Sequence, residues 1–380
     1  MKATKIITAV CWCVTALVLI GLAGWFAMGF FSGDRSDGWW SFNFNIGGWE
    51  ALTGPYEPVG SYNAEISGVD SMNIEWIAGD VRVEPHDGSE ILVTEYAQRE
   101  LNDNEKLRIG TSGGTLTIRY TQDSKIRRMP AKRLTVLVPR ELIGSFKNFT
   151  ADTTSGDLTI SGVGAASFTA DTTSGGLTVS GGVANSFKAD SMSGDLNLSN
   201  ITSQIFDADT TSGGITIDSF RADSMTLSSM SGDIRVTNAS VRTAECDTTS
   251  GLINLSGSFD KADFDSMSGN VTLNNTAARS VLTADTTSGK IDCSGNFDRV
   301  SLESMSGDIL VRSTSVPSEL DVETTSGAIS VAVPDEGGVS VAHSATSGKL
   351  SSDIPIITGG DNARFKFSTM SGDVKIFRLD

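Results

Sequence analysis

A Ser-Gly pair recurs twelve times along this chain at nearly constant spacing. Successive glycines lie 18 to 24 residues apart, and the first six lie 19 residues apart. A unit this short cannot bury a core of its own, so it must be one coil of a stacked solenoid. The glycines are Gly156, Gly175, Gly194, Gly213, Gly232, Gly251, Gly269, Gly289, Gly307, Gly327, Gly348 and Gly372.

Apolar and polar residues alternate on both sides of each glycine. The second residue after it is always aliphatic, as in Leu158 and Ile234, and the fourth is usually so. A period of two indicates a strand. Upstream, two further columns should point inward: Phe149, Phe168, Phe187 and Phe206, and Ala151, Ala170, Ala189 and Ala208. Each unit therefore holds two short strands, joined where glycine permits a conformation that a Cβ would penalise.

Thr and Met alternate two residues before the glycines, from Thr173 and Met192 to Met305 and Thr325, which raises the possibility of a 38-residue period. A rung of 38 residues would enclose an interior too wide for Val, Ile and Ala to fill. We therefore expect an all-β, parallel β-solenoid with about 19 residues per coil, stacked about 4.8 Å apart.

The run Thr-Thr-Ser-Gly-Asp-Leu-Thr-Ile at Thr153–Ile160, its successors and the strand Leu134–Pro139 resemble the bacterial putative adhesin family, a domain of unknown function in membrane-anchored envelope proteins. The resemblance covers Tyr62 to Asp380, and it is more degenerate before residue 140. It implies a β-solenoid fold and an envelope location, and the family name implies adhesion.

The N-terminus predicts a membrane anchor. Residues 6–31 carry no charge, and at 1.5 Å per residue they span about 39 Å, enough for a transmembrane helix. Lys2 and Lys5 precede the run, while Asp34 and Asp37 follow it. The positive-inside rule then leaves a cytoplasmic tail at 1–5 and places the solenoid outside a cell membrane crossed once.

A cleaved signal peptide, with Gly21-Leu22-Ala23 as its cleavage site, is the competing interpretation. The apolar run is longer than an ordinary signal core, which favours the anchor. After it, residues 32–61 form an aromatic, Gly-rich stalk. Residues 62–140 form degenerate coils that act as a cap, and residues 141–380 form the regular repeats.

The net charge of −17 excludes nucleic acid as an expected partner, because phosphate backbones require basic surfaces. One basic cluster could meet lipid headgroups or anionic polymer, although such runs are more often solvated loops. It consists of Lys125, Arg127, Arg128, Lys132 and Arg133.

Cys246 and Cys293 fall in inward columns of different units, so we expect buried thiols and no disulfide.

Carboxylates stand four residues before nine of the twelve glycines, and we expect them to face solvent at the edge of a turn. Stacked about 4.8 Å apart they could collect divalent cations. Asp in this position also simply hydrogen-bonds its own turn, which is the favoured interpretation. The residues are Asp152, Asp171, Asp190, Asp209, Asp247, Asp265, Asp285, Glu303 and Glu323.

A second acidic set directly follows the glycines and is expected to form polar turn residues: Asp157, Asp195, Asp233, Asp308 and Asp373. Only two histidines exist, His86 and His343, and the latter falls in an inward column. We therefore assign no catalytic, cofactor-binding or metal-binding residues, and expect no enzyme, cofactor or small-molecule substrate.

The final repeat, with Arg364, Lys366, Lys375 and Arg378 beside apolar residues, should form the outer edge of the stack and protect it by charge.

The leading functional hypothesis is a non-enzymatic surface protein that binds a cell-wall polymer or a membrane-protein partner. A regulatory component of envelope-stress sensing, acting through a membrane partner, is the alternative. A β-helical carbohydrate-active enzyme is less favoured, because the turns are too short to wall a cleft.

Overall fold

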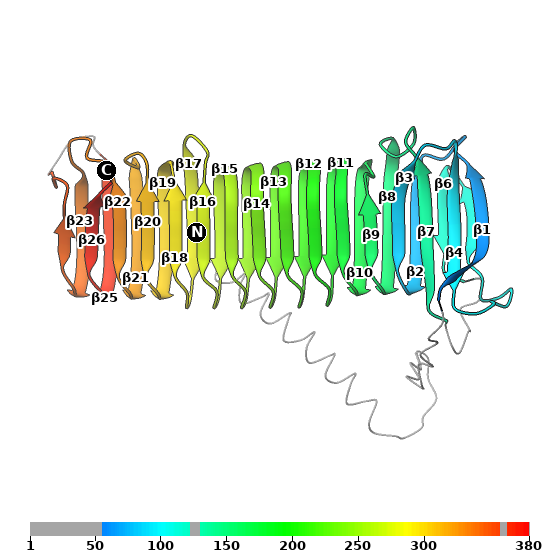
Figure 1. Cartoon of the computed structure of the whole chain (residues 1–380). Coiled ribbons are helices and arrows are strands. Elements are labelled where there is room, and N and C mark those ends of the chain that lie inside the picture. Colours follow the sequence, from blue (N-terminus) through cyan, green and yellow to red (C-terminus); the bar gives the residue numbers. More distant parts are fainter. Residues whose placement is uncertain (1–54, 122–129, 358–362, 380) are drawn as a thin grey trace, which may run out of the picture. The chain divides into compact units, whose positions relative to one another are not determined.

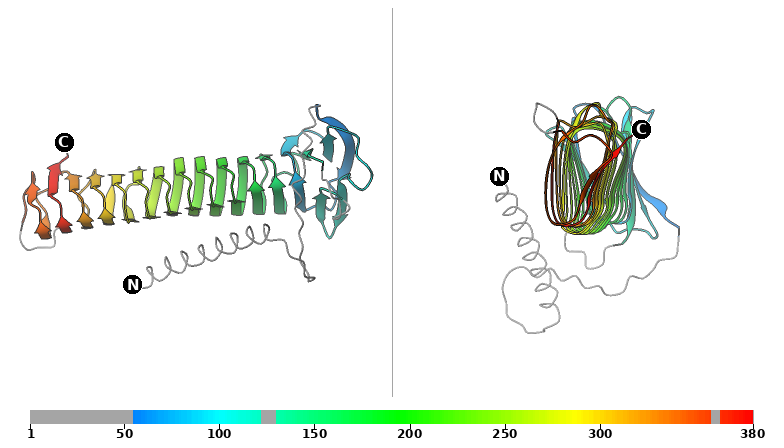
Figure 2. Two further views of the ribbon diagram at one scale, coloured as in Figure 1. Left: turned by 90° about the horizontal axis from the view of Figure 1, so that it is seen from below. Right: turned by 90° about the vertical axis from the view of Figure 1, so that its left-hand side faces the viewer.

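The computed structural model describes residues 55–121, 130–357 and 363–379. All regular elements in these ranges are β-strands, β1 to β26, and they form one hydrogen-bonded sheet system that winds into a flattened stack of coils (Figures 1 and 2). The predicted all-β solenoid is therefore confirmed for this part of the chain. The predicted helix at 6–31 and most of the stalk at 32–61 lie outside the described residues.

Each coil contributes one strand to each of two sheet faces. The first face contains β6 (Thr115–Arg119), β2 (Ser71–Ala78), β8 (Phe146–Ser155), β10 (Ala165–Ser174), β17 (Ser280–Thr286), β19 (Phe297–Ser306), β21 (Glu319–Ser326), β25 (Arg364–Ser371) and β23 (Ser340–Ser347). The second contains β7 (Lys132–Pro139), β3 (Val81–His86), β9 (Leu158–Ser161), β16 (Val271–Asn275), β18 (Ile291–Gly295), β20 (Ile309–Ser313), β22 (Ile329–Val333), β26 (Val374–Arg378) and β24 (Leu350–Ser352). Long strands in the middle contribute to both: β11 (Leu177–Ser191), β12 (Leu196–Thr210), β13 (Ile215–Ser229), β14 (Ile234–Thr248) and β15 (Ile253–Ser266).

Neighbouring coils pair in parallel and in register. Phe168 lies beside Phe187, and Asp171 lies beside Asp190, each one 19-residue repeat along the chain. This pairing selects the 19-residue coil over the 38-residue alternative. Every inward column of the repeat is thus continuous along the stack.

The interior is dry and built from these columns. Phe149, Phe168, Phe187 and Phe206 stack with ring centroids 5.1, 4.3 and 5.2 Å apart. The aliphatic residues two positions after the glycines are almost fully buried, except Leu350 at the C-terminal tip, and so are the free thiols of Cys246 and Cys293. Burial raises the pKa of both thiols. The prediction of buried, unbridged cysteines is confirmed.

The repeated glycines are required by close approach between coils more than by an unusual φ. A Cβ on Gly213 would lie 1.9 Å from the carbonyl oxygen of Gly194 in the preceding coil, and the same clash recurs at Gly232 and Gly251. Such a distance is far inside van der Waals contact. Positive φ values occur only at some members of the column, such as Gly156. An unusual backbone conformation, the reason for glycine inferred from the sequence, therefore explains only some members of this column.

Extra strands close the N-terminal end of the stack. β4 (Glu90–Ala97) pairs antiparallel with both β7 and β1 (Glu57–Glu65), and β5 (Arg108–Ser112) pairs antiparallel with β6. Apart from the start of β1, these strands all lie within residues 62–140, the segment for which the sequence predicts degenerate coils and a cap. The chain does not run through this end in order, because β2 and β3 lie between the β6–β7 coil and the β8–β9 coil.

The cap contains a buried ion pair. Lys132 and Glu95 are fully buried, with Nζ 2.6 Å from Glu95 Oε1. Nζ also donates to the backbone oxygens of Glu105 and Tyr120, and it lies over the Tyr120 ring. Burial lowers the pKa of Lys132. Lys132 therefore cannot belong to a solvated basic cluster, so that expectation is wrong for this residue.

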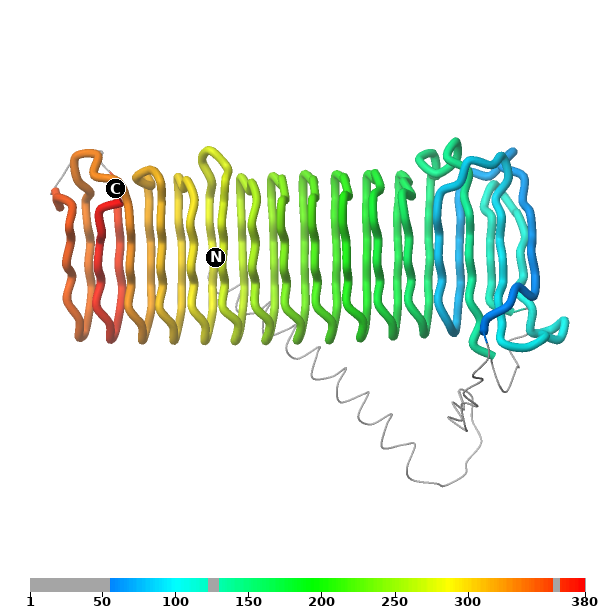
Figure 3. Tube along the Cα trace, in the orientation of Figure 1, coloured from blue at the N-terminus to red at the C-terminus, as the bar shows by residue number. Residues whose placement is uncertain are grey.

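The C-terminal end is also threaded out of order. β25 pairs with β21 on one side and with β23 on the other, while β26 lies between β22 and β24. The chain reaches the tip with β23 and β24 and then folds back to fill the coil beneath (Figure 3). The expectation that Arg364 to Arg378 forms the protected outer edge is therefore wrong.

Candidate functional site: a file of carboxylates on the first sheet face

The acidic residues four positions before the glycines align in a single file across the first sheet face. Asp152, Asp171, Asp190 and Asp209 are paired in register on β8, β10, β11 and β12. Glu75 of β2 extends the file toward the N-terminal cap. Beyond Asp209 the file is interrupted by Ser228 and resumes with Asp247, Asp265, Asp285, Glu303 and Glu323.

These side chains do not lie at the edge of a turn, as the sequence suggested. They project from the strands themselves, and Asp152, Asp171, Asp190 and Asp209 are half-buried between neighbouring coils. One carboxylate oxygen of each of Asp152, Asp171 and Asp190 is shielded from solvent and accepts no hydrogen bond. The protein therefore leaves part of the hydrogen-bonding capacity of these carboxylates unused.

Crowding of the carboxylates changes their acidity. Burial, followed by the charges of Asp190 and Asp152, raises the pKa of Asp171 to about 6. Burial likewise raises the pKa of Asp152 and of Asp209. An acid that is stacked between like charges and partly desolvated holds its proton more strongly, so Asp171 is incompletely ionised near pH 6.

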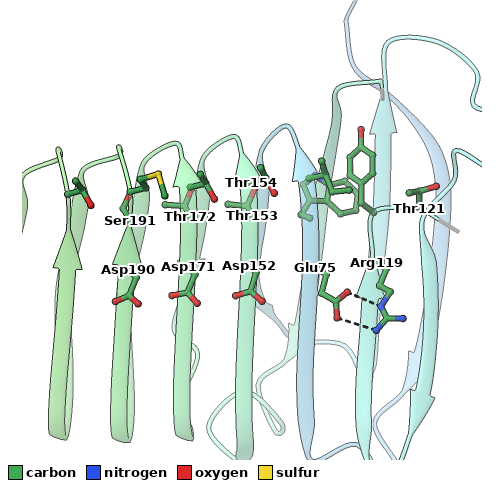
Figure 4. A pocket seen from close by; sticks show the side chains of 16 residues that line it. Glu75, Arg119, Thr121, Asp152, Thr153, Thr154, Asp171, Thr172, Asp190 and Ser191 are labelled. Carbon is green, nitrogen blue, oxygen red and sulfur yellow. Dashed lines mark hydrogen bonds and ion pairs between the residues drawn. The ribbon is translucent and has the colours of Figure 1, made fainter. Parts of the chain in front are cut away.

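The N-terminal end of the file lies in an open hollow of about 790 Å³. Four residues line the wall of this hollow on the cap side: Glu75 and Arg119, which Figure 4 labels, and Trp76 and Tyr120. Arg119 Nε donates to Glu75 Oε2 at 2.9 Å, so this wall already neutralises its own charge. The floor consists of file carboxylates, with threonine and serine side chains along the upper rim of the view: Asp152, Asp171, Asp190, Thr153, Thr154, Thr172 and Ser191.

One lysine partly compensates the file. Lys188 lies two residues before Asp190 on the same strand and forms an ion pair with its carboxylate. Among the described residues, no three His, Cys, Asp or Glu side chains come close enough together to hold a metal ion. The file therefore presents carboxylates one coil apart and offers no ready-made chelating cage.

The second acidic set has a structural role that the sequence did not reveal. Asp195 Oδ1 accepts a hydrogen bond from the backbone N–H of Gly214, and Asp233 Oδ1 accepts one from that of Leu252. The same arrangement links Asp157 to Gly176, Asp308 to Ala328 and Asp373 to Lys349. The prediction of polar turn residues holds, with the addition that they tie one coil to the next.

Neither histidine belongs to an assembled catalytic group. His86 Nε2 lies 2.8 Å from the backbone oxygen of Glu90, and its Nδ1 accepts from the N–H of Gly88. His343 lies on β23 at the C-terminal tip.

Of the basic cluster predicted from the sequence, Arg133 pairs with Asp80 and lies over the Tyr56 ring. Lys125, Arg127 and Arg128 lie outside the described residues.

The profile described as Toastrack DUF4097 matches residues 69–263 and 258–377. The chain belongs to the Toastrack DUF4097 family. These ranges include both sheet faces and the whole carboxylate file, so the resemblance to a family of unknown function is confirmed and carries no assigned activity with it.

The solved structures that this chain matches are distant in sequence. A "putative cell adhesion protein" from Clostridium sporogenes is 10% identical over 85% of this chain and 100% of its own, with a TM-score of 0.18. A "putative lipid binding protein" from Parabacteroides distasonis is 15% identical over 84% of this chain and 96% of its own, with a TM-score of 0.27. A "putative adhesin" from Bacteroides fragilis is 12% identical over 83% and 96%, with a TM-score of 0.24. Likeness at this level carries no argument about function.

The comparison with curated proteins found no match. Within the described ranges, no helix has the length and apolar character of a membrane span.

Proposed function

We propose that this Toastrack protein is a non-enzymatic, membrane-anchored component of the cell envelope, whose solenoid binds an extended partner along the first sheet face. The observation that carries the proposal is the file of carboxylates, repeated once per coil on the outside of consecutive strands. A regular row of equivalent groups suits a partner that is itself a repeating polymer.

The chemistry of the file favours a cationic or amine-bearing partner. Asp152, Asp171 and Asp190 stand one coil apart and are only half-buried, so an ammonium group can pair with the carboxylate oxygens that still face solvent. The hydroxyls of the neighbouring Thr154 and Thr173 are exposed and can contact a polar chain. We therefore favour a cell-wall polymer that carries amino groups over a membrane-protein partner.

The shape of the face argues against a reaction centre. The coils on either side of the file are joined by short turns, and the hollow at its N-terminal end is open to solvent. Catalysis of glycoside cleavage requires paired carboxyls that face each other across a substrate. Here the carboxyls stand side by side in one row and project from the same face.

The proposal is tested by co-sedimentation of the full chain with isolated cell-wall polymer. The triple variant Asp152→Asn, Asp171→Asn and Asp190→Asn should lose retention, and added salt should weaken binding of the unchanged protein. A matched control removes the same number of charges from the other acidic column: Asp157→Asn, Asp195→Asn and Asp233→Asn. Equal losses in both variants, or no loss in the first, would exclude the file as the binding surface.

A further inference from the structure

The two ends of the solenoid differ in how their last strands are covered. At the N-terminal end, the outer coil of β6 and β7 is covered by the antiparallel strands β5 and β4. At the C-terminal end, β23 and β24 pair inward with β25 and β26. One further bridge joins Val339, just before β23, to Ile356, through hydrogen bonds that Val339 N–H donates to the Pro355 oxygen and Ile357 N–H donates to the Val339 oxygen. Among the described residues, no strand pairs along the outer side of β23 or β24 themselves.

The C-terminal coil also leaves its inward columns open. Val341 and Leu350 are only half-buried, whereas their counterparts one coil deeper, Phe365 and Val374, are almost fully buried. Ile356 is 45% exposed beside this coil. The end of the core is therefore incompletely shielded.

The edge strands lack the devices that usually keep an edge from pairing. β23 reads Ser-Val-Ala-His-Ser-Ala-Thr-Ser, with no lysine, arginine, carboxylate or proline. An exposed edge without such protection is a template for another strand. The chain itself shows that its end coils accept antiparallel strands, because β4 and β5 do so at the opposite end.

Charges around β24 identify the partner that fits. Lys349 and Asp353 flank the strand symmetrically about Ser351, and all three residues are exposed. If β24 pairs antiparallel with a second copy of itself centred on Ser351, each Lys349 lies directly opposite Asp353 of the second copy. Opposite charges at directly opposed positions stabilise an antiparallel pair.

We infer that the C-terminal coil is a self-association surface, through which two chains join tip to tip about a two-fold axis. An axis normal to both sheet faces reverses the strand direction and the stacking direction together. It therefore pairs β23 with β23 and β24 with β24 in the same contact. The interface is isologous, and it contains the Lys349–Asp353 pair twice.

The first test measures the mass of the full chain, purified in detergent, by sedimentation equilibrium. We expect a dimer. Lys349→Glu alone, or Asp353→Lys alone, places like charges opposite each other and should raise the dissociation constant at least tenfold. The double exchange Lys349→Asp with Asp353→Lys restores the opposite pairing and should restore the dimer. All the substituted side chains are exposed, so melting temperatures measured at concentrations too low for dimer formation should not change.

The second test uses the residue on the two-fold axis. In a background with Cys11 and Cys13 replaced by serine, Ser351→Cys should form an intermolecular disulfide on mild oxidation, because directly opposed residues of antiparallel strands are within reach of one. The control is Ser330→Cys, which lies in the same column two coils deeper and should remain monomeric on a non-reducing gel.

Three outcomes would overturn the inference. The first is a monomeric chain at all soluble concentrations, which would mean that another segment or a different partner covers the tip. The second is a dimer that survives both single charge reversals. The third is a double exchange that fails to restore association. None of these outcomes depends on polymer binding by the carboxylate file, so this inference and the proposed function can fail separately.

Discussion

Asp195 Oδ1 accepts a hydrogen bond of 2.8 Å from the backbone N–H of Gly214, one coil further along the stack. The acceptor is an acidic residue in one coil, and the donor in the next coil is a residue without a carboxylate. The pattern repeats from Asp233 to Leu252 and from Asp308 to Ala328. In this stretch the alternation keeps like charges from stacking, and it repeats every 38 residues on a 19-residue coil.

Removing this acceptor should cost modest stability. Asp195→Ala leaves the Gly214 N–H to water and should lower the free energy of unfolding by about 1 kcal/mol, the ordinary net worth of one hydrogen bond. Asp195→Asn should be nearly neutral, because Asn270 already performs this function natively by accepting from the Lys290 N–H at 2.9 Å. Chemical denaturation of both variants measures the change in the free energy of unfolding. Equal decreases for Asp195→Ala and Asp195→Asn would show that the charge of Asp195 stabilises the coil, and not its ability to accept a hydrogen bond.

The glycine column should be intolerant of any side chain. Gly213→Ala introduces a Cβ 1.9 Å from a backbone oxygen of the preceding coil, which neither strand can avoid without breaking register. We expect a loss of about 4 kcal/mol or failure to fold. Gly144→Ala is the control, because a Cβ there meets nothing within 4 Å. Thermal melts that matched for the two variants would contradict the close-approach explanation.

The buried ion pair should be a sensitive point of the cap. Glu95→Ala leaves the Lys132 ammonium buried without its counter-charge and leaves the Leu107 N–H without its acceptor. Breaking a buried pair in this way costs about 3 to 5 kcal/mol. Protection of the β4 and β7 amides from hydrogen exchange should fall first. An exposed pair, Lys147 with Asp70, provides a control in which Asp70→Ala should have a small effect.

Asp171 should make the solenoid less stable as pH rises. Its pKa of about 6 lies above the ordinary value of 3.8, so the folded state binds more protons than the unfolded state between these values. Stability is therefore lost as pH rises from about 4 to 6. Asp171→Asn removes this penalty and should stabilise the protein at pH 7 by on the order of 1 kcal/mol after allowance for solvent screening.

At pH 4 the same substitution should have little effect, since Asp171 is then mostly protonated in the folded protein. The exposed Asp260, replaced by Asn, is a control for the removal of one carboxylate from the surface. A stabilisation by Asp171→Asn that is equal at pH 4 and pH 7 would rule out ionisation as its cause.

The coil and its inward columns could be predicted from the sequence, because both follow from the 19-residue repeat length and from the alternation of apolar and polar residues within each repeat. The Phe149 column and the Leu158 column are each visible as fixed offsets from a Ser-Gly pair, and parallel in-register stacking follows once the offsets are constant. The alignment of Asp152 with Asp171 was predictable for the same reason. Their half-burial was not, since it depends on how closely neighbouring strands pack.

The order of coils at the two ends could not be predicted, because a repeat identifies a coil and not its neighbour. Gly348 and Gly372 carry the same signature, yet Gly372 packs against Gly327 and Gly348 packs against Gly372. Lys132 was misassigned for a related reason. It lies close in sequence to other cations, whereas its partner Glu95 lies 37 residues away and becomes visible only when β4 joins β7.

The fold-back at both ends determines where this protein can change length. A repeat appended after β26 would begin one coil below the tip, where both neighbouring positions are already filled, so it could not extend the stack. Between Gly156 and Gly327, by contrast, each coil follows its predecessor in space as it does in sequence. Duplication or loss of whole repeats in that central stretch would change the reach of the protein by whole coils and leave both terminal structures untouched.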